Sequence, residues 1–200
     1  MTDLFKDKAV DWDERPVPTR ISEGVGAALL KAVILSPDMH VMDFGAGTGL
    51  LASHVAPHVE RIYAVDISAA MLEKLAAKPS LQGKVKTVCR DILKTPLGTS
   101  VDLIVSAMAM HHVADLGQLV QAFADHLPTG GVIAVADLDS EDGSFHPSNV
   151  EGVFHDGIDR ETLRDHLKAS GFGDIDFVTA VTIDKNEKRY PIFLVTAVKS

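Results

Sequence analysis

The stretch that decides the fold is VMDFGAGTG, which occupies residues 41–49. An apolar run containing one acidic residue, Asp43, leads into three glycines at alternate positions, and a run with helical spacing follows. Glycine is needed where a ligand comes too close to the backbone to leave room for a Cβ atom. A strand that turns into a helix also points backbone N–H groups and a helix N-terminus at that ligand. The segment therefore predicts a ligand-binding loop, with a tight turn that binds nothing as the plainer interpretation.

Strand and helix patterns alternate on both sides of this loop. We expect strands at residues 40–44, 61–65, 84–90, 101–105 and 131–137, and helices at 20–35, 50–57, 68–75, 115–127 and 159–170. Apolar strands that alternate with helices are typical of a parallel sheet covered on both faces.

The end of the chain breaks this alternation. Two strand patterns, 174–183 and 190–198, are separated only by residues 184–189, which are too few for a crossover helix, so these strands must pair antiparallel. Pro191 lacks an N–H group and is expected at the start of its strand. The predicted fold class is therefore α/β, with a mostly parallel, doubly wound, seven-stranded sheet that ends in an antiparallel hairpin.

Length and composition favour one soluble enzyme-like domain. The 200 residues suit a single domain, and the segment RPVPT at 15–19 is a linker between an N-terminal arm, residues 1–19, and the first helix. The net charge of −9 predicts no nucleic-acid partner. A single cysteine, Cys89, excludes an internal disulfide, and no apolar run is long enough for a membrane helix, so we expect a cytoplasmic protein with no membrane partner.

The spacing of the glycines separates two classes of nucleotide-like ligand. A dinucleotide fingerprint would need its third glycine at position 50, where the chain has Leu50, whereas here the third is Gly49. Asp66 ends the second predicted strand, where a carboxylate can accept hydrogen bonds from both hydroxyls of a ribose. Taken alone, Asp66 could equally cap the next helix.

This combination resembles the class I S-adenosylmethionine-dependent methyltransferases, from about residue 41 to residue 131, and in topology to the C-terminal hairpin. The residues that carry the resemblance are the GxGxG loop after an acidic strand, VDIS at 65–68 with Met71, RDI at 90–92, DLIVS at 102–106 and LPTGG at 127–131. The family implies a Rossmann-like methyltransferase fold that binds S-adenosylmethionine and releases S-adenosylhomocysteine.

The resemblance also implies roles for individual residues. In the family, the glycine loop wraps the methionine portion, the acidic residue after the second strand holds the ribose, and residues near it and after the third strand contact the adenine. Carried onto this chain, the cofactor-binding residues are Asp43, Gly45, Ala46, Gly47, Gly49, Asp66, Ile67, Met71, Asp91, Ile92 and Ala107. Phe5 and Trp12-Asp13 resemble the lid that many small-molecule relatives fold over the site, although a helix packed on the core would explain them nearly as well.

The protein needs to contribute little covalent chemistry to methyl transfer. Orienting the nucleophile can by itself lower the activation barrier by about 7–11 kcal/mol. A base adds rate where the nucleophile carries a proton. The candidate base is His111, which follows the fourth strand beside His112, although a structural histidine next to the cofactor is an equally natural interpretation.

An acidic segment at residues 137–156 follows the fifth strand and is longer than most loops. Its carboxylates and histidines could hold a metal, contact a cationic substrate, or form a solvated surface. We favour substrate contact through Asp139 and Glu141, with His146 and His155 beside the pocket, and assign no metal ligands.

The sequence therefore predicts a methyltransferase that transfers a methyl group to a small-molecule acceptor by in-line displacement. A non-catalytic S-adenosylmethionine-binding module, a protein methyltransferase and a nicotinamide-dependent oxidoreductase are the alternatives. Nothing in the residues indicates the acceptor or the oligomeric state.

Overall fold

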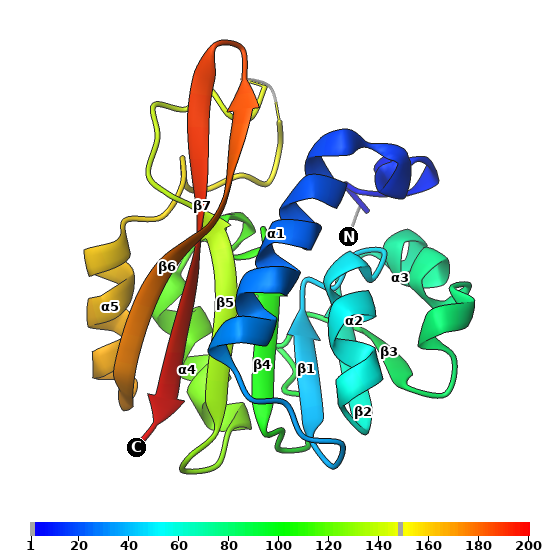
Figure 1. The fold of residues 1–200 in the computed structure, drawn as a ribbon, viewed down its shortest axis with the longest axis vertical. Coiled ribbons are helices and arrows are strands. Elements are labelled where there is room, and N and C mark those ends of the chain that lie inside the picture. Colours follow the sequence, from blue (N-terminus) through cyan, green and yellow to red (C-terminus); the bar gives the residue numbers. More distant parts are fainter. Residues whose placement is uncertain (1–2, 148–149) are drawn as a thin grey trace.

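The sheet has seven strands in the order β3-β2-β1-β4-β5-β7-β6, in a computed structural model that describes residues 3–147 and 150–200. The strands are β1 (His40–Phe44), β2 (Arg61–Asp66), β3 (Val85–Cys89), β4 (Leu103–Ala107), β5 (Val132–Leu138), β6 (Phe172–Lys185) and β7 (Lys188–Lys199). The first five are parallel to one another, and β7 runs antiparallel to both β5 and β6. The predicted fold class is confirmed (Figure 1).

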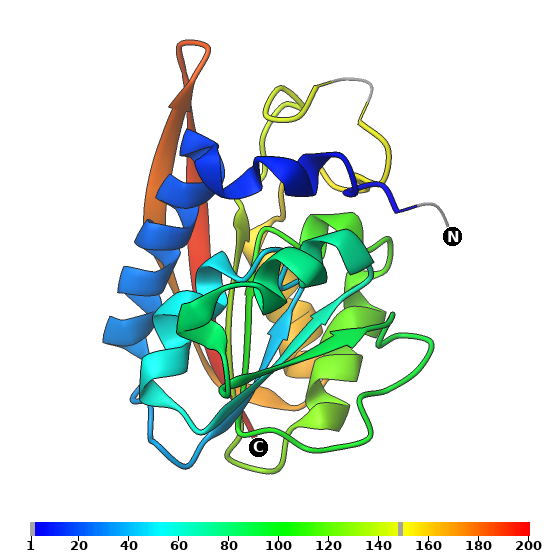
Figure 2. The same cartoon turned by 90° about the vertical axis from the view of Figure 1, so that its right-hand side faces the viewer.

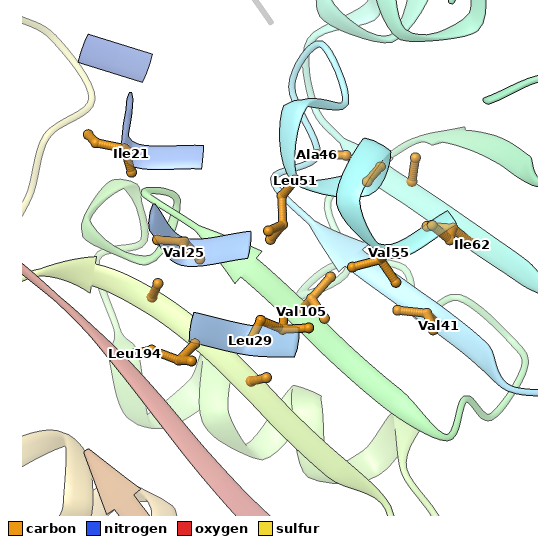
Figure 3. Close-up of a cluster of buried hydrophobic side chains, with 14 of the residues drawn as sticks. Ile21, Val25, Leu29, Val41, Ala46, Leu51, Val55, Ile62, Val105 and Leu194 are labelled. Carbon is orange, nitrogen blue, oxygen red and sulfur yellow. The ribbon is translucent and has the colours of Figure 1, made fainter. Parts of the chain in front are cut away.

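Helices cover both faces of this sheet (Figures 1 and 2). They are α1 (Pro16–Ala32), α2 (Leu50–Val55), α3 (Ala69–Ala76), α4 (Leu116–His126) and α5 (Arg160–Ala169). Successive residues of a strand point to opposite faces, so Val41 joins the apolar cluster under α1 and α2, and Met42 joins the one under α4 and α5. Figure 3 shows the first cluster, in which Val25 and Leu29 of α1 lie over Val105 of β4.

Three helices begin at side-chain caps that follow from the sequence. Ser68 accepts a hydrogen bond from the Met71 N–H at the start of α3, at 3.2 Å. Asp115 and Asp159 do the same at the start of α4 and α5, at 2.9 and 2.8 Å. Each cap supplies an acceptor to an N–H group that has no partner inside its helix.

The first helix begins earlier than the sequence indicated. Residues Pro16 to Thr19 form the first turn of α1, so the expected linker at residues 15–19 is wrong. Proline has a helical φ, and it needs no hydrogen-bond acceptor at the first helical position, so it starts a helix as readily as it interrupts a chain. The helix also ends earlier, at Ala32 rather than at residue 35.

The C-terminal hairpin is longer and tighter than expected. β6 and β7 pair as far as Lys185 and Lys188, and only Asn186 and Glu187, both at positive φ, form the turn. Pro191 is the fourth residue of β7 rather than its first. Its carbonyl accepts from Asp139 N–H just beyond the last pair of β5 with β7, so its missing N–H falls where that ladder ends.

No helix within the described ranges is both long enough and apolar enough to cross a membrane.

Gly49 should be irreplaceable for steric reasons, because it lies at φ +81° and a Cβ atom there would be 2.7 Å from Leu75 Cγ. Gly98 has a similar φ, +78°, but a Cβ atom there would meet nothing within 4 Å. We expect Gly98→Ala to lower the free energy of unfolding by about 1–2 kcal/mol through left-handed strain alone. Gly49→Ala should cost about 1–3 kcal/mol more through overpacking. Urea denaturation of both variants measures the difference, and equal losses would contradict it.

Candidate active site

The carboxyl ends of the parallel strands form one edge of the sheet, at the top of Figure 1. The pairings Phe44↔Val65 and Phe44↔Ser106 align the ends of β1, β2 and β4. The pairing Ala107↔Ala136 aligns β4 with β5. Segments far apart in the sequence therefore meet here, at the edge where open α/β sheets bind their ligands.

The glycine loop packs tightly at its first residue and is open at its middle one. Gly45 and Gly47 lie at φ +67° and +54°. A Cβ atom on Gly45 would be 2.2 Å from Ala109 Cβ, whereas the atom nearest to a Cβ on Gly47 would be Gly45 O at 4.0 Å. The backbone around Gly47 therefore faces space that a ligand can fill.

Asp66 joins this loop to the second strand. Its Oδ2 accepts the Gly47 N–H and its Oδ1 accepts the Ser68 N–H, both at 2.8 Å. Burial raises the pKa of this carboxyl above its ordinary value, although these two hydrogen bonds oppose the shift. Ser68, not Asp66, caps α3, so the carboxylate keeps lone pairs for further hydrogen-bond donors.

Asp43 is a buried acid directly before the loop, only 1% exposed. Its Oδ2 has no hydrogen-bond partner. Burial, and after it the charge of Asp66, raise the pKa of Asp43 to about 8. A buried oxygen without a partner is costly, and a polar or cationic group of a bound ligand would satisfy it.

The other residues that the family resemblance singled out lie around this edge in different environments. Ala46 and Met71 are buried, Ala107 ends β4, and Ile67 is 59% exposed. After β3, Asp91 accepts the Leu93 N–H at 3.0 Å and pairs with Lys94 at 2.7 Å. Ile92 lies in the apolar cluster under α4. The role of each in binding a cofactor stays a prediction.

The N-terminal arm lies across this edge (Figure 2). Asp3 Oδ2 accepts a hydrogen bond from Ser68 Oγ at 2.9 Å. Asp13 accepts one from Thr48 in the glycine loop and pairs with Lys78 at 2.6 Å. The arm is therefore fastened to both segments that flank the open space.

The same arm reaches a cluster of three histidines: His111 and His112 in the turn after β4, and His146 in the loop after β5. Their ring centroids are 4.2 Å apart for His111 and His112, 4.9 Å for His111 and His146, and 6.4 Å for His112 and His146. Phe5 meets the ring of His112 edge to face at 5.2 Å. The cluster is thus enclosed by two loops and the arm.

His111 is held by Asp137 of β5. His111 Nδ1 and Asp137 Oδ1 are 2.6 Å apart, and the two side chains are 2% and 0% exposed. Burial alone would raise the pKa of Asp137, but the charge of His111, its hydrogen bond and the N–H groups of His111 and Leu138 hold it below its ordinary value. Asp137 is therefore ionised, and its partner nitrogen carries a proton.

The other two histidines are neutral at neutral pH. Burial, followed by the charge of His111, lowers the pKa of His112 and of His146 to about 4. The Nε2 atoms of His111 and His146 are buried, and each of them lacks a hydrogen-bond partner among the described residues.

The carboxylates of Asp139 and Glu141 in the acidic loop contact other groups of the protein. Asp139 forms two hydrogen bonds with Arg160, at 2.6 and 2.7 Å, so its charge is already neutralised. Glu141 Oε2 accepts the N–H groups of Ser144 and Phe145, and so holds the loop in its turn. Glu141 Oε1 is buried without a partner, and contact of Asp139 and Glu141 with a cationic substrate stays a prediction.

The two histidines of that loop, His146 and His155, have different surroundings. His146 joins His111, whereas His155 Nε2 lies 2.9 Å from the Val113 carbonyl oxygen. In the part of the chain that the structure describes, no group of three or more His, Cys, Asp or Glu side chains is arranged to hold a metal ion.

In the sequence, Asp137 is only the first residue of the acidic segment 137–156, and its pairing with His111 was not predicted. The available signal was the position of Asp137 at the end of a strand that neighbours the strand leading to His111. Asp13 was expected only as part of the lid-like arm, and Asp3 had no predicted role, since contacts between an arm and a distant loop leave no local pattern.

Comparison with known proteins shows similarity to methyltransferases. Residues 42–135 match the model of a methyltransferase domain. An uncharacterized methyltransferase of Schizosaccharomyces pombe is 30% identical over 135 residues, which cover 60% of this chain and 48% of that protein. One from Geobacillus sp. is 27% identical over 180 residues, 86% of this chain and 83% of that one. These matches support a class I S-adenosylmethionine-dependent methyltransferase.

A solved structure supports the same fold for this methyltransferase. The N-methyltransferase NodS of Bradyrhizobium japonicum, in complex with S-adenosylhomocysteine, matches it with a TM-score of 0.73 at 16% identity. The match covers 98% of this chain and 94% of that chain. The aligned part of this chain spans about half the length of the Schizosaccharomyces pombe relative, so the two proteins share the domain but not their whole length.

The raised pKa of Asp43 predicts how the stability of this methyltransferase varies with pH. The folded chain keeps this proton up to about pH 8, and the unfolded chain releases it near the ordinary value of 3.8, so rising pH between these values favours unfolding. We expect Asp43→Asn to raise the free energy of unfolding at pH 7 by at least about 1 kcal/mol, since one pKa unit corresponds to about 1.4 kcal/mol. At pH 4 the two proteins should be nearly equal.

Urea denaturation at both pH values makes this measurement, with Asp125→Asn on the exposed surface of α4 as the control. A gain of the same size at pH 4 and pH 7, or no gain at either, would show that Asp43 is ionised in the folded protein.

Proposed function

We propose that this chain transfers a methyl group from S-adenosylmethionine to a small-molecule acceptor, releasing S-adenosylhomocysteine. The observation that carries the proposal is the open backbone at Gly47, flanked by the lone pairs of Asp66 and by the unpartnered oxygen of Asp43. A ligand with ribose hydroxyls and an ammonium group suits these two acids. The residues therefore fit the cofactor that the family uses.

Each part of the site has a separate task in this proposal. The loop from Gly45 to Gly49, with Ala46, would hold the amino-acid portion over Asp43, and Asp66 would accept the ribose hydroxyls. Ile67 and Met71, with Asp91 and Ile92 after β3, would border the adenine. Ala107, at the end of β4, would border the base of the cofactor site.

When bound, S-adenosylmethionine supplies a methyl group already activated by a positive sulfur. The protein then has to orient the acceptor in line with that methyl group and exclude water. The arm does the second task through its contacts with Thr48, Ser68 and His112. Residues 1–19 are therefore proposed as the lid of a single domain.

His111 is the proposed proton acceptor for this reaction. It follows β4 at the carboxyl edge, its Nε2 is unpartnered, and its Nδ1 is held by Asp137. The arm and the loop after β5 enclose the histidine cluster, which favours a small acceptor over a protein side chain presented on a folded surface.

Binding of the reaction product tests the proposal directly. S-Adenosylhomocysteine should bind with one site per chain in calorimetry and raise the melting temperature through linkage. Asp66→Ala should weaken binding by about 1–3 kcal/mol, because a charged acceptor is lost. Asp125→Ala, which removes an exposed acid from α4, is the matched control and should bind normally. Absence of heat and of any thermal shift at millimolar ligand would contradict the proposed function.

A further inference from the structure

Three imidazoles whose ring centroids lie within 6.4 Å of one another cannot all be positively charged in a poorly solvated site. A proton on one repels protons from the other two, because like charges in a poorly solvated site interact strongly. The cluster of His111, His112 and His146 can therefore accept at most about one proton beyond its three neutral rings, and its surroundings decide which ring accepts it.

Those surroundings are unequal. Asp137 contacts His111 twice, through Nδ1 at 2.6 Å and through the backbone N–H at 3.1 Å. Its Oδ1 also accepts the Leu138 N–H at 2.8 Å, so the carboxylate cannot turn away without losing a strand contact. The Nδ1 atom of His112 meets only the neutral Gly152 carbonyl oxygen, at 2.7 Å. An imidazolium is stabilised far more by a carboxylate than by a carbonyl oxygen.

Resting on the proposed function, we propose that Asp137 is the positioning residue that holds the Nδ1 proton of neutral His111 and so leaves its Nε2 as the proton acceptor of the cluster. The methyl acceptor is then a hydroxyl or amine that loses a proton on methylation. Neutral His112 and His146 border this nitrogen without competing for the proton. The buried pair can then carry one proton as a neutral imidazolium–carboxylate unit.

The step balances without another reactant. The O–H or N–H bond of the acceptor breaks and its bond to the methyl carbon forms, while the carbon–sulfur bond breaks with its electron pair left on sulfur and the proton moves to His111 Nε2. Asp137 faces an imidazole that gains one positive charge during this transfer. An acceptor with no such proton, such as a tertiary amine or a thioether, would gain nothing from the pair.

Nitrogen-15 NMR of the histidine rings tests the assignment without turnover. In the wild-type protein at pH 8, His111 should carry its proton at Nδ1, and His112 and His146 should remain neutral down to about pH 4. Asp137→Asn should abolish the preference of His111 for the Nδ1 proton. Asp142→Asn removes an exposed acid of the same loop that pairs with Lys188, and it should leave the His111 spectrum unchanged.

Turnover provides the second measurement, using a panel of phenols, alcohols and primary amines against a panel of tertiary amines and thioethers. Only the first panel should yield S-adenosylhomocysteine, and Asp137→Asn should lower kcat on it by about 10²-fold with product binding unchanged. A wild-type His111 that carries its proton at Nε2 overturns the inference even if the variant fails to fold. Equal turnover of both panels, or a variant as fast as wild type, also overturns it. Failure of S-adenosylhomocysteine to bind would instead overturn the proposed function.

Discussion

The parallel alignment of β2, β1, β4 and β5 is the constraint on which the site depends. Because paired parallel strands end at one edge, the loop after Phe44, the carboxylate of Asp66 and the pair of His111 with Asp137 are brought together from distant parts of the chain. The hydrogen bond from Gly47 N–H to Asp66 then fixes the loop against the neighbouring strand. If one of these strands ran in the opposite direction, the groups at its carboxyl end would lie at the other edge of the sheet.

Two buried acids at this edge reach opposite protonation states for an identifiable reason. Asp43 and Asp137 both lose nearly all contact with water. Asp43 has a like charge, Asp66, as its neighbour, and its pKa rises, whereas Asp137 has a histidine and two backbone N–H groups, and its pKa falls. Burial supplies the same penalty to each, so the partner decides the charge. One acid is therefore suited to receiving a polar ligand and the other to holding an imidazolium.

The sequence predicts the local parts of this structure well. The tight turn at the glycines and the antiparallel hairpin depend on neighbouring residues, and the structure confirms both. The start of α1 was wrong because proline is compatible with both a linker and a first helical turn. The pairing of Asp137 with His111 and of Asp139 with Arg160 depends on segments that only the folded sheet brings together, so periodicity and motif spacing could not show them.

The arm links the two halves of the site physically. One half is built from backbone next to β1 and β2, which a sequence motif reveals, and the other from side chains on the loops after β4 and β5. Asp13 contacts Thr48 in the first half, and Phe5 contacts His112 in the second. The two contacting residues are only eight positions apart, and Phe5 meets Trp12, the neighbour of Asp13, edge to face at 6.5 Å. A shift of the arm would therefore disturb both halves together. The same short segment that contacts the glycine loop also covers His112 through Phe5, and the lowered pKa values of His112 and His146 are caused first by burial.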